Sequence, residues 1–336
     1  MKKLYTLSFA LIATLGFAQT YIPFTGTGAL SSNGWTTHSG TPGQLTTLTT
    51  PSDNGSSLSF PGLLASTANR TAIVAGNSED MNFPLATAIT GTTYFSTLIK
   101  VLDDTQLNIN TAVGDYSLML TSAVGTSTTT FQARVYFKKG TTAGKYSVGI
   151  LNNSGGTAAP TYITTDLSIN TTYLLVVKYD ITTNTASLFL NPTPGAAEPA
   201  ATVTNATGTT AAPTSILGFA IRQGGNATAG TGNMEIDEIR VGTTFASVTP
   251  QGTAGLNDNN IAGFSMYPNP LKGNTLYLTS TANGTKSVQI FDVVGKQVVN
   301  ANTTNNAVNV ANLNAGVYIV KVTEEGKTAT RKLIIQ

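Results

Sequence analysis

Hydrophobic and polar residues alternate with a period of two along much of the chain. Residues 130–139, TFQARVYFKK, place Phe131, Ala133, Val135 and Phe137 on one face and Gln132, Arg134, Tyr136 and Lys138 on the other. This alternation is typical of a strand that buries one face. Similar short segments, separated by Gly, Asn, Ser, Thr and Pro, occur at 92–102, 116–122, 145–151, 171–180, 185–191, 215–223 and 233–242. The pattern predicts a succession of strands without a helix.

Many short strands at this spacing predict a large sandwich or jelly roll. The composition favours the same fold, because the chain has 33 glycines, abundant threonine and almost no Ala/Leu/Glu/Lys helical pattern. A length of 336 residues is sufficient for two domains. We therefore predict an all-β protein with two domains.

The second domain is predicted after a polar linker at 250–261, PQGTAGLNDNNI, which is rich in Gly and Asn. The charge balance changes there, from 9 basic and 13 acidic residues in 19–261 to 7 basic and 3 acidic in 262–336. Short strands predict a small immunoglobulin-like β-sandwich, at 264–268, 275–280, 286–295, 296–300, 307–313, 316–325 and 327–336. Because proline cannot donate to a ladder, Pro268 and Pro270 should end the first of them.

The first residues, MKKLYTLSFALIATLGFAQT, combine two lysines, an apolar stretch and small residues before Gln19. This pattern predicts a signal peptide over residues 1–18, cleaved near Ala18 after passage through the Sec machinery. The apolar stretch is too short for a membrane span, and no later segment is long enough, so no transmembrane segment is expected. We predict domains at 19–249 and 262–336, joined by the linker.

Charge and cysteine content exclude several classes of function. Removing Lys2 and Lys3 with the signal peptide leaves 16 basic and 16 acidic residues, with no basic cluster. Binding of nucleic acid is disfavoured, because it needs clustered Lys and Arg. The chain has no cysteine, so the exported fold must be stabilised without disulfides.

The last 75 residues carry a series of separated motifs, namely MYPNP (266–270), LYL (276–278), VQIFDVVGKQV (288–298), VNVANLNAGVYIVKV (308–322) and GKTATRKLII (326–335). In order and spacing this segment resembles the type A C-terminal sorting domain of the bacterial type IX secretion system. The resemblance implies an outer-membrane translocon and a sortase-like protease as partners. It also implies passage through the periplasm to the cell surface or the medium. Its recognition and turn residues would be Tyr267, Pro268, Asn269, Pro270, Gly295, Lys296, Gly316, Tyr318, Gly326 and Lys327.

The domain before the linker resembles the concanavalin A-like or laminin G-like jelly rolls of secreted bacterial proteins. The segments that carry this looser resemblance are NGWTTHSG, ARVYFKKG, YLLVVKYD followed by SLFLNP, FAIRQGG and IDEIRVGTTF. The resemblance implies a fold that serves lectins, adhesion modules, enzymes and spacers. The fold alone therefore does not select a function.

Glycoside hydrolysis would need a pair of carboxyl groups, one of them acting as acid/base. Glu235 and Asp237 are the catalytic candidates, because they share one face of the segment MEIDEIRV. Glu238 is expected on the opposite face with Ile236, and no second glutamate completes the hydrolase pattern. The simpler interpretation is a closing strand with Arg222 as an ion-pair partner, so we do not predict an enzyme.

His38 and Trp35, the only histidine and the only tryptophan, lie together in SSNGWTTHSG. His38 is adjacent to Ser39, but neighbours in a strand point to opposite faces and no GxSxG motif is present. A single histidine without cysteine also excludes most zinc sites. Trp35 follows a turn at Asn33-Gly34, which favours a core position and leaves a ligand-binding role as the alternative.

Calcium is the one metal that the composition leaves open, because it accepts carboxylate and backbone oxygens. Asp103, Asp104 and Asp115 are its weak candidate ligands, within LDDTQLN and VGDYS, and SEDMN (78–82) offers further oxygens. None of these segments matches an EF-hand loop, and solvated turn carboxylates are the simpler interpretation. No cofactor is otherwise expected.

Three functions remain open at this point. The first is non-catalytic binding or adhesion at the cell surface, with a glycan or a surface protein as the ligand. The second is a glycan-degrading hydrolase that uses Glu235 and Asp237, and the third is a passive surface-structural protein. The lectin-like resemblance without a usable acid/base pair favours the first.

Overall fold

A computed structural model describes residues 20–48, 57–66, 69–226, 228–252, 261, 263–325 and 327–336. The chain forms two compact units, residues 1–253 and 254–336. The predicted signal peptide and most of the predicted linker lie outside the described residues, so the domain limits stay predictions. None of the helices in the described part of the chain has the length and apolarity that a membrane crossing requires.

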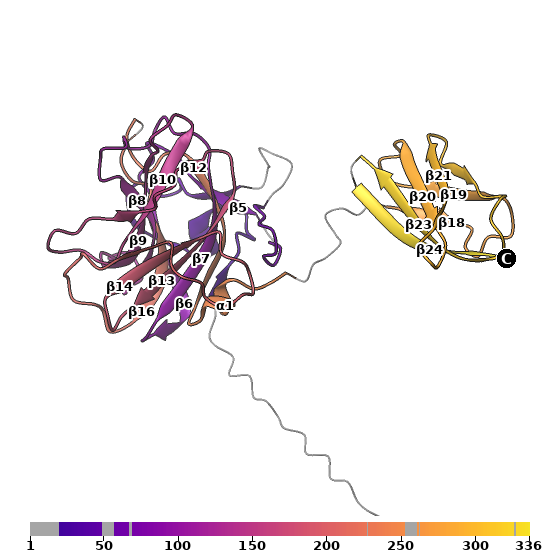
Figure 1. Cartoon of the computed structure of the whole chain (residues 1–336). Coiled ribbons are helices and arrows are strands. Elements are labelled where there is room, and N and C mark those ends of the chain that lie inside the picture. Colours follow the sequence, from indigo (N-terminus) through magenta and orange to yellow (C-terminus); the bar gives the residue numbers. More distant parts are fainter. Residues whose placement is uncertain are drawn as a thin grey trace, which may run out of the picture. The chain divides into compact units, whose positions relative to one another are not determined.

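The first unit contains a nine-stranded antiparallel sheet, shown in part in Figure 1. Its strands in spatial order are β15 (Val203–Asn205), β14 (Thr185–Leu190), β13 (Tyr173–Asp180), β7 (Thr93–Val101), β17 (Met234–Gly242), β5 (Arg70–Ile73), β4 (Thr46–Leu48) and β2 (Gly28–Ala29). The ninth strand, β1 (Thr20–Ile22), pairs with β17 beside this path.

The second sheet of this unit has eight antiparallel strands. In spatial order they are β11 (Thr161–Tyr162), β10 (Lys145–Leu151), β9 (Phe131–Lys139), β8 (Asp115–Thr121), β16 (Ile216–Ile221), β6 (Asp80–Ile89) and β3 (Thr36–Ser39). The eighth strand, β12 (Leu167–Ser168), pairs with β10 beside this path.

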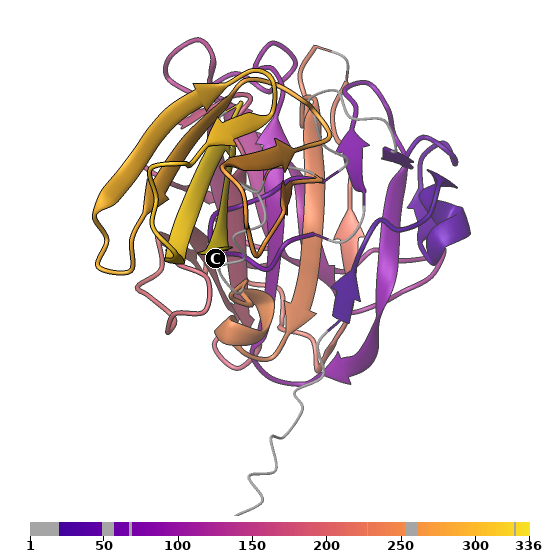
Figure 2. The same ribbon diagram turned by 90° about the vertical axis from the view of Figure 1, so that its right-hand side faces the viewer.

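The two sheets face each other, as the two views in Figures 1 and 2 show, and one hydrophobic core lies between them. Phe95 and Ile99 of β7 enter this core from the nine-stranded sheet, and Val135 and Phe219 enter it from the eight-stranded sheet. All four side chains are fully buried. The predicted all-β jelly-roll sandwich is confirmed.

The outer faces of the two sheets differ. On the nine-stranded sheet a second apolar cluster covers Leu98, Leu174 and other strand residues. Its cover consists of residues 57–63 and the one-turn helix α1 (Phe245–Val248). No such apolar cluster covers the outer face of the eight-stranded sheet within the described ranges. The outer face of the eight-stranded sheet is therefore the less covered of the two.

Three features of the first unit differ from the sequence predictions. The structure contains α1 and a 3-10 helix, η1 (Leu30–Asn33), where no helix was expected. Segment 78–82, considered above as a source of turn oxygens, includes the start of the ten-residue strand β6. This strand contains Pro84, and the pairing register with β16 shifts at that point, which explains why the sequence did not indicate it.

The second unit consists of two small sheets that enclose their own hydrophobic core. One sheet has the order β18 (Ser265–Tyr267), β19 (Thr275–Thr279) and β22 (Ala307–Asn309). The other has the order β21 (Gln297–Thr303), β20 (Lys286–Phe291), β23 (Gly316–Glu324) and β24 (Lys327–Ile335). The predicted small C-terminal sandwich is confirmed, and β18 ends directly before Pro268, as expected.

Lys286 and Glu324 form a buried ion pair inside the second unit. Their side chains are 0% and 2% exposed, and Lys286 Nζ lies 3.0 Å from Glu324 Oε1. Lys286 also donates to the Gly284 carbonyl and to Asn306. We expect Lys286→Met to destabilise this unit by about 3 kcal/mol, because an uncompensated carboxylate stays buried. Thermal unfolding followed by circular dichroism measures the effect, whereas fluorescence of Trp35 reports the first unit alone.

The matched control is Lys321→Met on β23, where the lysine side chain is exposed. This control should change stability by no more than about 0.5 kcal/mol. An equal effect of both substitutions would show that the ion pair contributes nothing specific.

Candidate functional sites

Three tyrosines gather on the outer face of the eight-stranded sheet, and we call them the tyrosine platform: Tyr116 of β8, Tyr136 of β9 and Tyr162 of β11. The ring centroids of Tyr116 and Tyr136 are 5.3 Å apart. The Tyr162 ring lies over Gly149 of β10, where an added Cβ would stand 3.0 Å from the ring carbons. A glycine at this position therefore allows the third ring to lie flat against the sheet.

Three cations lie against the tyrosine platform. The Arg222 and Arg134 guanidinium carbons are 4.5 and 5.2 Å from the centroid of the Tyr116 ring. The Lys138 ammonium is 4.2 Å from the centroid of the Tyr162 ring. These are cation–π distances, and they restrict the motion of the three long side chains. The face therefore presents cations in defined positions.

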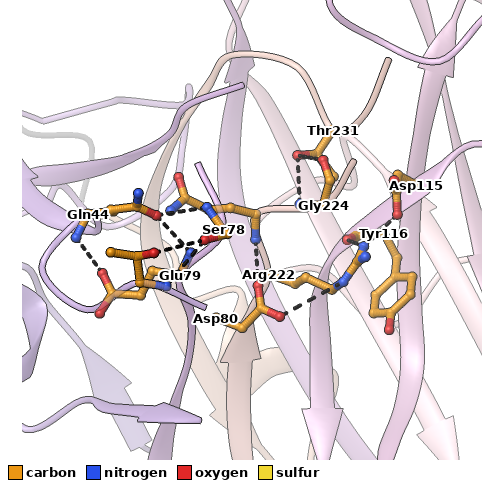
Figure 3. A network of polar contacts seen from close by, with 11 residues as sticks. Gln44, Ser78, Glu79, Asp80, Asp115, Tyr116, Arg222, Gly224 and Thr231 are labelled. Atoms are coloured by element: carbon orange, nitrogen blue, oxygen red, sulfur yellow. Dashed lines mark hydrogen bonds and ion pairs between the residues drawn. The ribbon is translucent and has the colours of Figure 1, made fainter. Parts of the chain in front are cut away.

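Arg222 is neutralised by two carboxylates at the edge of the platform (Figure 3). Its Nη1 lies 2.5 Å from Asp115 Oδ1, and its Nε lies 4.0 Å from Asp80 Oδ2. Burial raises the pKa of Asp80 to about 6, although Arg222 and the N–H of Gln223 act in the opposite direction. Arg222 therefore pairs with β6 and β8 and not with the closing strand, so the prediction from the sequence was wrong.

Arg134 and Lys138 have no such neutralisation. Arg134 donates from Nε to the Phe131 carbonyl at 3.3 Å, and Lys138 donates to the Asn110 carbonyl at 2.8 Å. Neither side chain forms an ion pair with a carboxylate among the described residues. The positive charge of these two residues is therefore available to a ligand.

The loop at residues 43–45 is held in place by the carboxylate of Glu79, which is fully buried. It accepts hydrogen bonds from the N–H groups of Gly43, Gln44 and Leu45 at 3.0, 2.7 and 2.6 Å. The Gln44 side chain in turn accepts from the Glu79 N–H at 3.0 Å, as Figure 3 shows. Segment 43–45 is thereby held next to Asp80 and the start of β6.

Trp35, the sequence candidate for ligand binding, lies in the core of the first unit with 4% exposure. Its ring packs against Phe83 at 5.4 Å, Phe24 at 6.3 Å and Phe219 at 6.5 Å between centroids. Both faces of a buried indole are unavailable to a sugar ring. The geometry agrees with the core alternative and gives no support to stacking of a ligand on Trp35.

His38 lies on β3 against the ring of Phe131, at 5.4 Å between centroids. Its Nδ1 is 3.1 Å from the amide nitrogen of Asn82, which also bonds to the carbonyl of Gly125. Burial lowers the pKa of His38. No hydrogen bond to Ser39 or to a carboxylate is found for this side chain in the described residues, so no catalytic relay is formed.

The hydrolase candidates Glu235 and Asp237 are buried on the outer side of the nine-stranded sheet, with 2% and 1% exposure. Glu235 pairs with Arg70 at 2.9 Å. Asp237 accepts from the N–H groups of Leu58 and Glu238 at 2.8 and 2.7 Å. Burial nevertheless raises the pKa of Asp237 to about 7. Glu235 thus pairs within the sheet, whereas Asp237 holds the segment at Leu58 against it, and the burial of both leaves no access for a polysaccharide.

Glu238 does not share the face of Ile236, as the alternation predicted. Its φ is +54°, and the pairing register with β7 shifts between Asp237 and Arg240. The Glu238 carboxylate forms an ion pair with Arg240 and accepts a hydrogen bond from Tyr21 at 2.6 Å. Ile236 instead belongs to the core between the sheets. The bulge explains this correction, because it interrupts the period of two.

The calcium candidates do not gather at one point. The structure pairs each carboxylate with a protein donor: Asp103 with Thr105 and Asn233, Asp104 with Gly144, and Asp115 with Arg222. Within the described ranges, no group of three or more His, Cys, Asp or Glu is placed to hold a metal ion. Calcium binding remains a prediction, and none of these contacts supports it.

In the second unit, the segment YPNP is tied to the last strand. Asn269 donates to the Lys332 carbonyl at 2.7 Å and accepts from the Ile334 N–H at 2.9 Å. Tyr267 is 48% exposed, and its ring stacks on Tyr277 at 5.7 Å. Asn269 thus has a structural contact, and Tyr267 presents part of its ring to solvent.

The remaining sorting candidates fall into turn and strand positions. Gly295 has φ of +86° in the turn after β20, and Lys296 bonds there to Asp292. Gly316 is the first residue of β23. Tyr318 of the same strand lies in the core, and its hydroxyl donates to the Asn314 carbonyl at 2.9 Å. Lys327 opens β24, and Gly326 lies outside the described residues. Their roles in recognition stay predictions.

The tyrosine platform was not identified from the sequence. The alternation in 130–139 does assign Arg134, Tyr136 and Lys138 to one face. Tyr116 and Tyr162, however, come from β8 and β11, and only the sheet order and register align them with Tyr136. Their proximity could not be read from spacing in one chain segment.

Comparison of the fold with solved structures finds several similar β-proteins. A protein of unknown function from Shewanella oneidensis MR-1 is 15% identical, with a TM-score of 0.38, over 73% of this chain and 98% of that one. The VIP36 exoplasmic/lumenal domain in its Ca2+/Man2-bound form is 15% identical, with a TM-score of 0.36, over 69% and 90%. A sialidase is 8% identical, with a TM-score of 0.36, over 68% of this chain and only 19% of its own length. TM-scores of this size add nothing to the description of the fold, which rests on the strand order.

Comparison of the sequence with curated proteins finds no match. The family model described as the secretion system C-terminal sorting domain matches residues 265–336. This match covers nearly all of the second unit, and it implies secretion to the cell surface or beyond through contact with the secretion machinery. The resemblance noted from the motifs is thus confirmed, and residues 265–336 are a secretion-system C-terminal sorting domain.

Proposed function

We propose that the chain is a secreted or cell-surface binding protein without catalytic activity. Its first unit would bind a glycan or a surface protein on the outer face of the eight-stranded sheet, and the sorting domain would direct its export. The observation that supports this proposal is the tyrosine platform with its ordered cations, on a sheet face that no apolar cluster covers in the described residues. Aromatic rings and arginines are the residues that most often dominate binding energy at protein surfaces.

The hydrolase alternative has less support. Glu235 and Asp237 have 2% and 1% exposure and bond to Arg70 and Leu58, so a substrate has no access to them. Access to the platform is better, because Tyr116, Tyr162 and the cations are partly exposed, although Tyr136 between them is only 7% exposed. A passive structural role would not require cations held against aromatic rings on this sheet face.

Substitution of Tyr162 tests this proposal. We expect Tyr162→Ala to weaken ligand binding about tenfold, because one platform ring is lost. A glycan array probed with the whole chain, in calcium and in a chelator, identifies ligands, and titration of the best ligand measures the change.

The matched control is Tyr277→Ala, which removes one ring of a stacked and exposed tyrosine pair in the second unit. It should leave binding unchanged. Equal affinity of Tyr162→Ala and the unchanged chain for every bound glycan would contradict the platform as the binding site. A blank array would direct the search to surface proteins.

A further inference from the structure

We infer that the ligand of the tyrosine platform is an acidic polysaccharide, whose anionic groups bind Arg134 and Lys138. This inference rests on the proposed binding function and specifies its ligand class. It begins from the charges on the outer face, since a neutral glycan has no need of unpaired cations.

Two positive charges on this face remain after internal pairing. Arg222 is paired with both Asp115 and Asp80, so this group has one carboxylate more than cations and supplies no positive charge to a ligand. Arg134 and Lys138 donate to the carbonyls of Phe131 and Asn110, and neither has a carboxylate partner among the described residues. They leave two positive charges on a first unit that is acidic in total, with 9 basic and 13 acidic residues in 19–261. Placement of two unpaired cations on one face of an acidic unit favours an anionic ligand.

Both cations lie against aromatic rings. Arg134 lies 5.2 Å from the centroid of the Tyr116 ring, and Lys138 lies 4.2 Å from that of Tyr162. Arginine and lysine normally lose considerable side-chain entropy when a ligand fixes them. Since the tyrosines already restrict them, less of this cost remains at binding.

The spacing of the two cations along β9 favours an extended ligand. Arg134 and Lys138 are four residues apart on one face of β9, so their Cα atoms are about 13 Å apart at the rise of a strand. One sugar ring is too short to reach both positions, whereas a chain of several rings can. Tyr136 lies between them on the same face. The arrangement therefore fits a polymer with repeated anionic groups, laid along β9.

The experiment compares matched polymers with the whole chain. Polygalacturonate and its fully methyl-esterified form have the same sugar backbone with and without charged carboxylates. Dextran sulfate and dextran likewise share one backbone with and without sulfate groups. We expect at least one acidic polymer to bind at least tenfold more tightly than its neutral counterpart, and the difference to shrink as salt is added. Monomeric galacturonate should not compete. Comparison of the two polymer pairs shows whether the chain binds carboxylate or sulfate groups.

The variants Arg134→Gln and Lys138→Gln should each weaken binding of the acidic polymer several-fold and leave binding of a neutral polymer unchanged. The control is Lys178→Gln, because Lys178 also lies over a tyrosine ring, 5.5 Å from Tyr94, but is paired with Glu198 at 2.9 Å. Unchanged Trp35 emission confirms that each variant is folded.

Two outcomes would overturn the inference in different ways. Equal binding of acidic and neutral polymers, unaffected by either glutamine variant, would remove the acidic ligand and leave the proposed binding function intact. Binding of neither polymer pair by a folded chain, together with a blank glycan array, would remove glycan binding altogether.

Discussion

A chain without residues 265–336 is expected to be retained inside the cell envelope, in a bacterium that has the type IX secretion system. The reason is that these residues form the sorting domain, which is the part of the chain that the translocon would recognise. The whole chain should appear at the cell surface or in the medium, whereas the shortened chain should accumulate in the periplasm. Fractionation of cells that express each form measures the difference, which should be close to complete.

Folding of the retained protein must be checked, because a misfolded cargo would also stay inside. Trp35 is the only tryptophan and lies in the core of the first unit, so its emission reports the state of that unit. Native emission from retained protein would attribute the export defect to loss of the sorting domain. Appearance of the shortened chain outside the cell would contradict the assigned role of residues 265–336.

Asp237 should make the stability of the first unit depend on pH. Burial raises its pKa from 3.8 to about 7 in the folded chain, so between these values the folded state binds more protons than the unfolded state. Stability from this group is therefore fully present below about pH 4 and decreases as the pH rises to about 7. The full difference amounts to about 4 kcal/mol at 1.36 kcal/mol per pH unit.

The matched variant is Asp237→Asn, which cannot ionise. Its amide has one oxygen for the two N–H groups of Leu58 and Glu238, and its own contribution to stability does not vary with pH. Wild type should lose stability relative to this variant by about 4 kcal/mol between pH 4 and pH 8. Urea unfolding of both chains, followed by Trp35 emission, measures the difference, and a constant difference across this range would be incompatible with the shifted carboxyl group.

Much of the fold was predictable from the chain because most strands keep the period of two. The strands predicted at 130–139, 145–151 and 185–191 agree with β9, β10 and β14 to within a residue. Each of the seven segments predicted in the second unit also overlaps a strand, although the segments at 286–295 and 307–313 extend four residues beyond β20 and β22. Local pattern was sufficient wherever one face of a strand met a single core.

Prediction failed where local backbone geometry overrides the pattern. Glu238 has a positive φ, and the bulge at this position moves its side chain away from the face that alternation assigns. The platform was missed for a different reason, because Tyr116 and Tyr162 are far apart in the sequence and meet through the strand order β11, β10, β9, β8. Spacing along one segment contains no information about such neighbours.

Strand β9 has consequences for how this protein can change during evolution. Val135 and Phe137 enter the core between the sheets, whereas Arg134 and Lys138 lie on the opposite face, outside the apolar clusters of the described residues. Replacement of Arg134 or Lys138 thus removes no core packing, so these positions can vary at little cost in stability. Related chains can acquire new ligands by exchanging alternate residues of one strand while the fold stays the same.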